Sequence, residues 1–162
     1  LLLLVCLIVP ACQQKHEGAS SPVISVVDLS GSPSRLSFAS APVTAINLWA
    51  TWCVPCKTEI KNLIELHDEF TARGCSIIGV ALDSIQPDRL KPPVAAMGIP
   101  YPVYAGDADD ILRETGVSAI PATLFIDRTG TIVKRLVGYH TKEELRLALD
   151  GVLTAAAHGK VP

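Results

Sequence analysis

The sequence has 162 residues, of which 14 are basic and 16 are acidic, and its net charge is −2 with the histidines neutral. This length indicates a single domain that can bury a hydrophobic core. The chain has no run of basic residues, so we do not expect nucleic acid among its partners.

The N-terminal stretch, LLLLVCLIVPAC, is apolar up to Val9. It is too short to span a bilayer as a helix but has the length of the apolar region of a secretory signal. Ala11 and Cys12 resemble a bacterial lipobox, in which the cysteine becomes the lipidated N-terminus. We therefore expect residues 1–12 to be a lipoprotein signal, truncated at its start, with Cys12 as the lipidation site. An ordinary cleaved signal and a buried N-terminal strand are the alternatives.

Residues 13–22 are mostly polar or small and predict a flexible tether, which argues against the buried strand. The tether leads into a folded domain that we place at residues 23–157. This organisation predicts an extracytoplasmic protein, anchored by lipid on the periplasmic side of a membrane. That compartment is oxidising, so neighbouring cysteines form a disulfide there unless a partner keeps them reduced.

The first half of the folded part predicts a hairpin followed by a βαβ unit. Residues 23–29 and 35–38 flank the turn-rich SGSPS and predict the hairpin. VTAINLWA (43–50) and CSIIGVAL (75–82) are nearly continuous apolar runs, typical of strands buried on both faces. Between them, residues at three- and four-residue spacing predict a helix that ends at Gly74: Ile60, Leu63, Ile64, His67 and Phe70.

After the second buried strand, Pro92 and Pro93 interrupt the pattern. Because both prolines cannot sit inside a helix, we expect a short turn before them and then a helix with Pro93 in its first turn, ending near Gly98. A short strand at 101–106 and a helix at 107–116 follow.

The C-terminal part predicts two strands and a helix. Residues 121–127 and 131–138 form a hairpin around the turn DRTG. TKEE (141–144) has the form of a capping box. The apolar face of the final helix is marked by Leu145, Leu149 and Val152. The order β-β-β-α-β-α-β-α-β-β-α predicts an α/β fold with a mixed sheet between helices.

The motif WCVPC places Cys53 and Cys56 at the start of the first predicted helix. Backbone N–H groups and the dipole at a helix N-terminus favour a thiolate, and CxxC pairs there have a pKa below the value of about 8.5 of a free cysteine. Cys53, the outer residue, is predicted to attack a partner's disulfide. Cys56, one turn later and shielded, then resolves the mixed disulfide. Half of a zinc site and a purely structural disulfide are the alternatives.

The remaining cysteines and histidines do not suggest a metal site. Structural zinc usually needs a second pair of ligands, and His67, His140 and His158 lack pair spacing. We expect His67 to be a partly buried helix residue and His140 a solvated loop residue. Cys6 would leave with the signal, and Cys75 is expected to pack as a small apolar side chain. We expect neither a metal nor another cofactor.

Three stretches together identify a known family: WATWCVPC, SAIPATLFID and GTIVKRLVGY. They resemble the membrane-anchored TlpA/ResA-like thiol–disulfide oxidoreductases of the thioredoxin superfamily, over residues 23–153. The resemblance implies a thioredoxin-like α/β fold with an added N-terminal β-hairpin and a central αβ insertion. The double proline at 92–93 departs from the family pattern in that insertion.

The resemblance also implies roles for single residues. Pro121 matches the family's cis-proline, which faces the redox pair, and the backbone of Ile120 would then pair with an extended substrate segment. A plain strand-start proline is the alternative. Glu59 matches an acidic residue near the pair, and its place one turn from Cys56 suits proton exchange with that thiol. A solvent-facing glutamate in the first turn is the alternative.

Three residues around the motif complete the expected site. Asn47 takes the place of the buried acid of cytosolic thioredoxins and cannot ionise, so it cannot accept a proton. We expect Trp49 to pack in the core. Trp52, next to Cys53, is expected to form an apolar rim against which substrates dock.

We therefore predict a monomeric, lipid-anchored thiol–disulfide oxidoreductase that reduces protein disulfides by two-cysteine exchange. The resemblance implies disulfide-bonded or thiol proteins as substrates, apocytochrome c among them, and a membrane thiol-transfer protein as electron donor. An oxidase or isomerase with the same chemistry is the first alternative. A copper-binding assembly factor is the second, although only His140 could join the cysteines as a ligand. A peroxidase is weaker still, because a peroxidatic cysteine would not need a neighbour.

Overall fold

The computed structural model describes residues 24–157. The signal and tether predicted for residues 1–22, with Cys6 and Cys12, lie outside the described residues. Within residues 24–157, no helix combines the length and apolar character that crossing a membrane requires.

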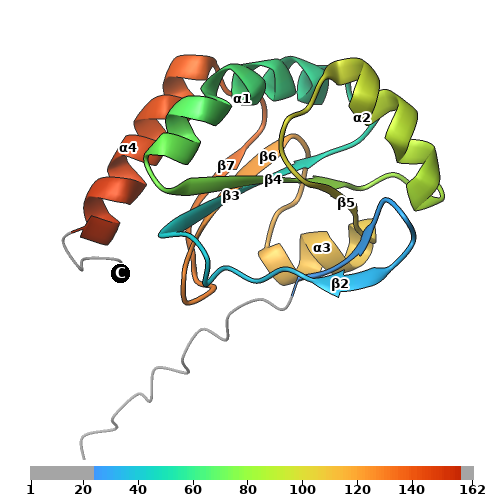
Figure 1. Ribbon diagram of the computed structural model, residues 1–162, viewed down its shortest axis with the longest axis horizontal. Coiled ribbons are helices and arrows are strands. Elements are labelled where there is room, and N and C mark those ends of the chain that lie inside the picture. The colour runs from blue at the N-terminus through green and yellow to red at the C-terminus, as the bar shows by residue number, and fades with distance from the viewer. Residues whose placement is uncertain (1–23, 158–162) are drawn as a thin grey trace, which may run out of the picture.

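The described residues form seven strands, four α-helices and one 3₁₀ helix in the predicted order (Figure 1). The strands are β1 (Ser25–Asp28), β2 (Pro33–Arg35), β3 (Val43–Trp49), β4 (Cys75–Ala81), β5 (Val103–Ala105), β6 (Ala122–Asp127) and β7 (Ile132–Val137). The helices are α1 (Val54–Ala72), η1 (Pro87–Leu90), α2 (Lys91–Met97), α3 (Ala108–Thr115) and α4 (Lys142–Ala157).

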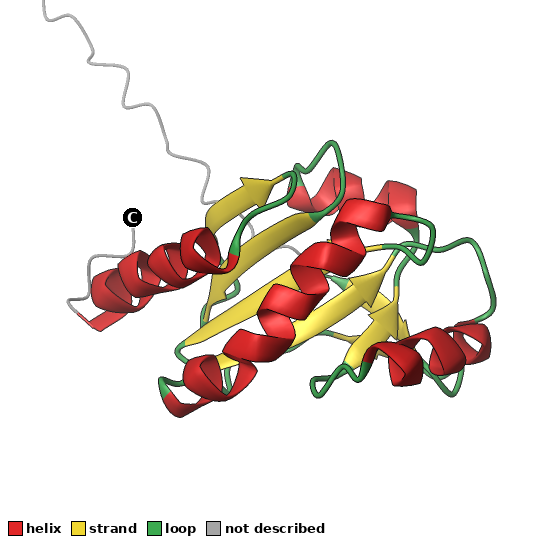
Figure 2. Ribbon diagram, turned by 90° about the horizontal axis from the view of Figure 1, so that it is seen from above, coloured by secondary structure: helices red, strands yellow, loops and turns green. Residues whose placement is uncertain are grey.

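All seven strands belong to one mixed sheet of order β2-β1-β5-β4-β3-β6-β7. Helices α1, α2 and α4 cover one face, and α3 covers the other (Figures 1 and 2). The hairpin β1–β2 extends the sheet at the β5 edge. The α/β prediction, with its hairpin and βαβ unit, is confirmed.

Strand β3 lies near the middle of the sheet and sets the position of the site. It pairs parallel with β4 and antiparallel with β6. Ala45 packs toward α1 and α4, whereas Ile46 and Leu48 pack toward α3. Because side chains alternate along a strand, Asn47 lies on the same face as Ala45, beneath α1. On β6, Thr123 stands directly opposite Asn47.

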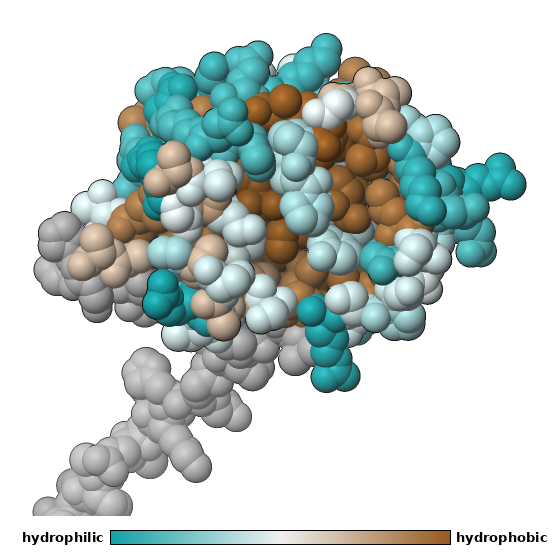
Figure 3. Space-filling view, viewed as in Figure 1, coloured by the Kyte–Doolittle hydropathy of each residue, from teal (hydrophilic) through white to brown (hydrophobic). Residues whose placement is uncertain are grey.

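Helix α1 begins immediately after Cys53, which is its N-cap residue, and the chain leaves it at Gly74 with φ +81°. Its buried side chains are Cys56, Glu59, Ile60, Leu63, Leu66 and Phe70. Figure 3 shows hydrophilic residues gathered over the upper left of this view and apolar residues across its middle. Glu59 is the one charged side chain on the buried face of α1.

The prediction for the double proline was wrong in one respect. Both Pro92 and Pro93 lie in the first turn of α2, which η1 precedes. The first N–H groups of a helix have no intrahelical partner, so successive prolines are tolerated there. The second strand of the hairpin also lies earlier than predicted, at Pro33–Arg35 rather than at 35–38.

The chain passes closely over the sheet between β5 and α3, at Gly106. A Cβ atom there would lie 2.8 Å from Val80 Cγ1 and 2.9 Å from Ile111 Cγ1. Both neighbours are fully buried and cannot move aside freely. We expect Gly106→Ala to lower the free energy of unfolding by about 1–3 kcal/mol, measured by urea denaturation of the oxidised protein.

Gly151→Ala is the matched control. Gly151 lies in α4 with no atom within 4 Å of an added Cβ. Alanine should there stabilise the helix by about 0.5–1 kcal/mol. Equal effects of the two substitutions would contradict the close packing at Gly106.

Candidate active site

Cys53 and Cys56 are joined by a disulfide at the N-terminus of α1. The backbone N–H of Cys56 donates to Cys53 Sγ at 3.3 Å. Cys53 is 5% exposed, whereas Cys56 is completely buried. Cys53 is thus the more exposed member of the pair, and its role as the attacking sulfur stays a prediction.

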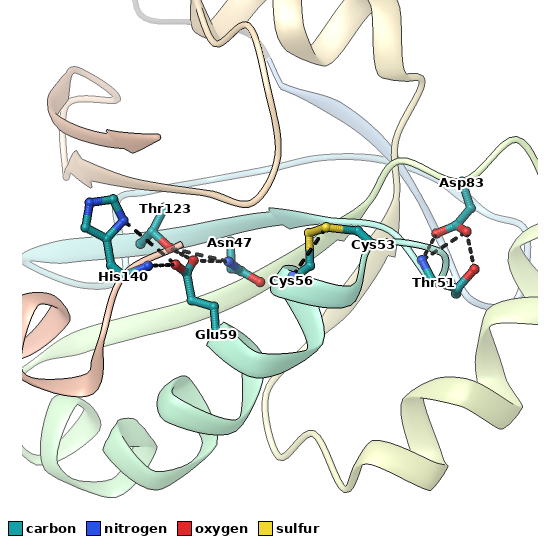
Figure 4. The surroundings of a disulfide bond; sticks show 8 residues. All are labelled: Asn47, Thr51, Cys53, Cys56, Glu59, Asp83, Thr123 and His140. Carbon is teal, nitrogen blue, oxygen red and sulfur yellow. Dashed lines mark hydrogen bonds and ion pairs between the residues drawn. A yellow bond between two sulfur atoms is a disulfide. The ribbon is translucent and has the colours of Figure 1, made fainter. Parts of the chain in front are cut away.

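Glu59 lies on α1 about one turn beyond Cys56 and has no exposed surface. Its Oε1 accepts hydrogen bonds from Asn47 Nδ2 and Thr123 Oγ1, each at 3.0 Å. Its Oε2 accepts from the backbone N–H of His140 at 2.8 Å (Figure 4). The alternative of a solvent-facing glutamate is excluded.

Burial raises the pKa of Glu59 above its usual value of 4.5. The hydrogen bonds from His140, Thr123 and Asn47 favour the charged form, as does the nearby imidazole of His140, but they only partly offset the desolvation. A carboxyl group of this kind can take up and release a proton closer to neutral pH than an exposed glutamate can.

Asn47 holds the carboxylate in place from the sheet. Its Nδ2 donates to both Glu59 Oε1 and Thr123 Oγ1, at 3.0 and 3.3 Å. Its Oδ1 is buried without a hydrogen-bond partner among residues 24–157, and Figure 4 draws this side chain between Glu59 and Cys56. Asn47 thus orients the carboxyl group without taking up a proton itself.

The Ile120–Pro121 bond is cis, as the resemblance implied. Pro121 is anchored by its carbonyl oxygen, which accepts from Gly138 N at 2.8 Å. Ile120 is half-buried and packs against the apolar cluster that contains Cys53 and Cys56. The start of β6 therefore adjoins the redox pair.

Two exposed apolar residues flank Cys53 in the chain. Trp52 is 69% exposed and Val54 is 72% exposed. Trp49, by contrast, is buried beneath the pair, as predicted. Two large, exposed apolar residues beside a reactive sulfur provide a surface on which a protein can dock.

The other residues singled out from the sequence fall outside this arrangement, except His140. Cys75 is buried at the start of β4, and its burial raises the pKa of its thiol to about 12. His67 is half-buried on α1, with its ring 6.1 Å from that of Tyr101. The described residues contain no group of three or more side chains suited to hold a metal ion. His158 lies beyond them.

His140 lies in a loop before α4, as predicted, but the prediction that it is solvated was wrong. Its side chain is 21% exposed, and its Nδ1 lies 3.9 Å from Glu59 Oε2. The close contact is the backbone donor to Glu59, which no side-chain pattern reveals. Thr123 was also missed, although it follows Pro121 closely on a strand predicted to be buried.

A second carboxylate close to the pair was missed as well. Asp83 is 8% exposed at the end of β4. It accepts hydrogen bonds from the backbone N–H and the hydroxyl of Thr51. The sequence offered one indication of this contact: Thr51 and Asp83 each directly follow a predicted buried strand.

The chain was compared with known protein families and structures. Residues 18–135 match the AhpC/TSA family. Thiol-disulfide oxidoreductase ResA of Bacillus thuringiensis is 33% identical over 129 residues, which are 79% of this chain and 73% of that protein. Thiol:disulfide interchange protein HelX of Rhodobacter capsulatus is 32% identical over 71% of this chain and 63% of that protein.

The fold agrees with solved structures. A thiol:disulfide interchange protein of the thioredoxin family from Chlorobium tepidum superposes with a TM-score of 0.66 at 26% identity, over 82% of this chain and 94% of that one. A thioredoxin-like protein from Porphyromonas gingivalis gives 0.70 at 28% identity, over 85% and 94%. With its disulfide and its cis-proline, the chain belongs to the AhpC/TSA family and, within the thioredoxin superfamily, to the TlpA/ResA-like thiol–disulfide oxidoreductases.

Proposed function

We propose that this protein reduces disulfides of extracytoplasmic proteins, with Cys53 as nucleophile and Cys56 as resolving thiol. The observation that carries this proposal is the fully buried Glu59 carboxyl group, one turn beyond Cys56 on the same face of α1. A resolving thiol inside a protein needs a nearby group that takes its proton, and Glu59 supplies one.

The exchange proceeds in two steps. The Cys53 thiolate attacks one sulfur of the substrate disulfide, whose bond breaks as a mixed disulfide forms, and the other substrate sulfur leaves as a thiolate that takes up a proton. Cys56 then gives its proton to Glu59, directly or through water, and attacks Cys53. The second substrate thiolate leaves, and the Cys53–Cys56 disulfide holds the oxidation. A membrane thiol-transfer protein returns the two electrons.

The substrate docks on the apolar surface beside Cys53. Trp52 contributes its exposed indole, and Ile120 with Pro121 offers backbone at the start of β6 for a short extended segment. Apocytochrome c, which carries cysteines that must be reduced, is the substrate class we propose. The protein acts as a monomer, held at the periplasmic side of a membrane by a lipid on Cys12.

The reductase assignment predicts turnover with a model disulfide. The reduced wild-type protein should reduce insulin, whereas Cys56→Ala should stop at a mixed disulfide through Cys53, which dithiothreitol releases. Mass spectrometry identifies the adduct, and Cys75→Ala is the control with wild-type activity. A reduction potential near about −120 mV would indicate an oxidase in place of a reductase. Failure to reduce insulin would exclude the enzyme.

The role of Glu59 predicts a pH-dependent defect. Glu59→Gln keeps the size of the side chain but cannot accept the proton of Cys56, so resolution of the mixed disulfide should slow by about 100-fold at pH 7. The wild-type rate should rise with pH through the raised pKa of Glu59, and the variant should lack this rise. Glu65→Gln, on the exposed face of α1, is the control. Equal pH profiles for both variants would exclude proton transfer to Glu59.

The same pKa has a consequence for stability. A carboxyl group whose pKa is raised by folding binds its proton more tightly in the folded state, so stability falls as pH rises from the unfolded pKa through the folded one. The free energy of unfolding of Glu59→Gln, minus that of the wild type, should therefore increase with pH above about 4.5. Urea denaturation between pH 4 and pH 8 measures this difference. A constant difference would contradict the raised pKa.

A further inference from the structure

The turn between β3 and the redox pair is held from the neighbouring strand. Leu82 N donates to Trp49 O at 2.8 Å, and Cys53 N donates to Ala50 O at 3.1 Å. The first contact continues the parallel pairing of β3 with β4 past its last residues, and the second closes the turn that leads from β3 to Cys53. The end of β4 thus lies against the segment that leads into Cys53.

Asp83 adds a side-chain clamp at this point. Both oxygens of its carboxylate accept from Thr51 N, at 3.1 and 3.0 Å, and Oδ1 also accepts from Thr51 Oγ1 at 2.5 Å. Within residues 24–157, this carboxylate accepts hydrogen bonds from Thr51 alone, two residues before Cys53. The exposed Trp52 lies between Thr51 and Cys53 in the chain, so the segment that carries its indole is attached to Asp83 through Thr51.

Within the described part of the chain, the charge of Asp83 has no partner cation. Among the described residues, no lysine, arginine or histidine forms an ion pair with it. Figure 4 draws Asp83 and Thr51 on the Cys53 side of the disulfide and Glu59 on the Cys56 side. A fixed negative charge on the side of the attacking sulfur disfavours its thiolate, in opposition to the N-terminus of α1.

We propose that Asp83 is a positioning residue for the disulfide exchange: through Thr51 it fixes the turn that presents Cys53, and its unbalanced charge biases the pair toward the disulfide. Because a less stable dithiol form gives up its two electrons more readily, Asp83 makes the reduced protein a stronger reductant. The inference deepens the proposed reductase function and rests on it for its biological meaning. The equilibrium between the dithiol and disulfide forms of the Cys53–Cys56 pair can be measured whatever the natural substrate is.

The test compares variants of the full chain in a glutathione redox buffer. Asp83→Asn keeps the size and one acceptor oxygen but removes the charge, so its dithiol form should gain about tenfold in equilibrium against glutathione. The pH midpoint for alkylation of Cys53 by iodoacetamide should fall as well, because the thiolate is no longer opposed. The readouts need no protein substrate, so their outcome is separate from the insulin assay.

Asp127→Asn is the matched control. Asp127 accepts from Thr129 N and Thr129 Oγ1, at 2.9 and 2.6 Å, in the turn after β6. The substitution therefore removes the same kind of carboxylate–threonine contact without changing the charge at the end of β4. It should leave both the glutathione equilibrium and the alkylation midpoint at their wild-type values.

Substitutions of Thr51 separate charge from geometry. Thr51→Val keeps the charge of the carboxylate but removes one hydrogen-bond donor that partly offsets it. The pH midpoint for alkylation of Cys53 should therefore rise, whereas it falls in Asp83→Asn. Thr51→Ser retains the hydroxyl and should behave as the wild type. The Thr51 pair also decides the matter if Asp83→Asn does not fold. Wild-type values for Asp83→Asn or for Thr51→Val, shifts of both in the same direction, or shifts equal to those of Asp127→Asn would overturn the proposal.

Discussion

A carboxylate that is removed from water must find hydrogen-bond donors within the protein, and this requirement ties the site together at Glu59. Its donors come from β3, from β6 and from the loop that follows β7. Because β3 lies beside β6 with Asn47 opposite Thr123, both side chains reach the same carboxylate of α1. The position of the proton acceptor Glu59 therefore depends on the order of the strands in the sheet.

The sequence predicts the helices and strands better than it predicts which residues of different elements contact one another. Apolar runs and helical spacing define β3, α1 and β4 because burial and secondary-structure period are local properties. The opposition of Asn47 and Thr123 depends on strand register, which is set by packing and turn geometry across the whole sheet. For the same reason the backbone donor of His140 could not be foreseen, since it depends on where a loop settles and not on what its side chain is.

The site could be predicted where the chemistry lies in a motif. Cys53 and Cys56 are neighbours in the chain, and the cis bond before Pro121 came from a resemblance, because proline alone rarely implies it. Asp83 lies in no motif. It becomes visible only when two facts are joined: β3 and β4 run parallel, so their carboxyl ends share one edge, and a polar residue stands two positions after each, Thr51 or Asp83.

The two carboxylates bear on the direction of the chemistry. A disulfide oxidant owes its strength to a stabilised dithiol form, which favourable charges around the thiolate provide. Here the redox pair has Glu59 beyond Cys56 and Asp83 on the Cys53 side, and within residues 24–157 neither carboxylate is paired with a lysine or arginine. The favourable influence on the thiolate is the N-terminus of α1, which the two carboxyl groups oppose when they are ionised. Such surroundings disfavour the dithiol form, which suits a protein that passes its electrons on.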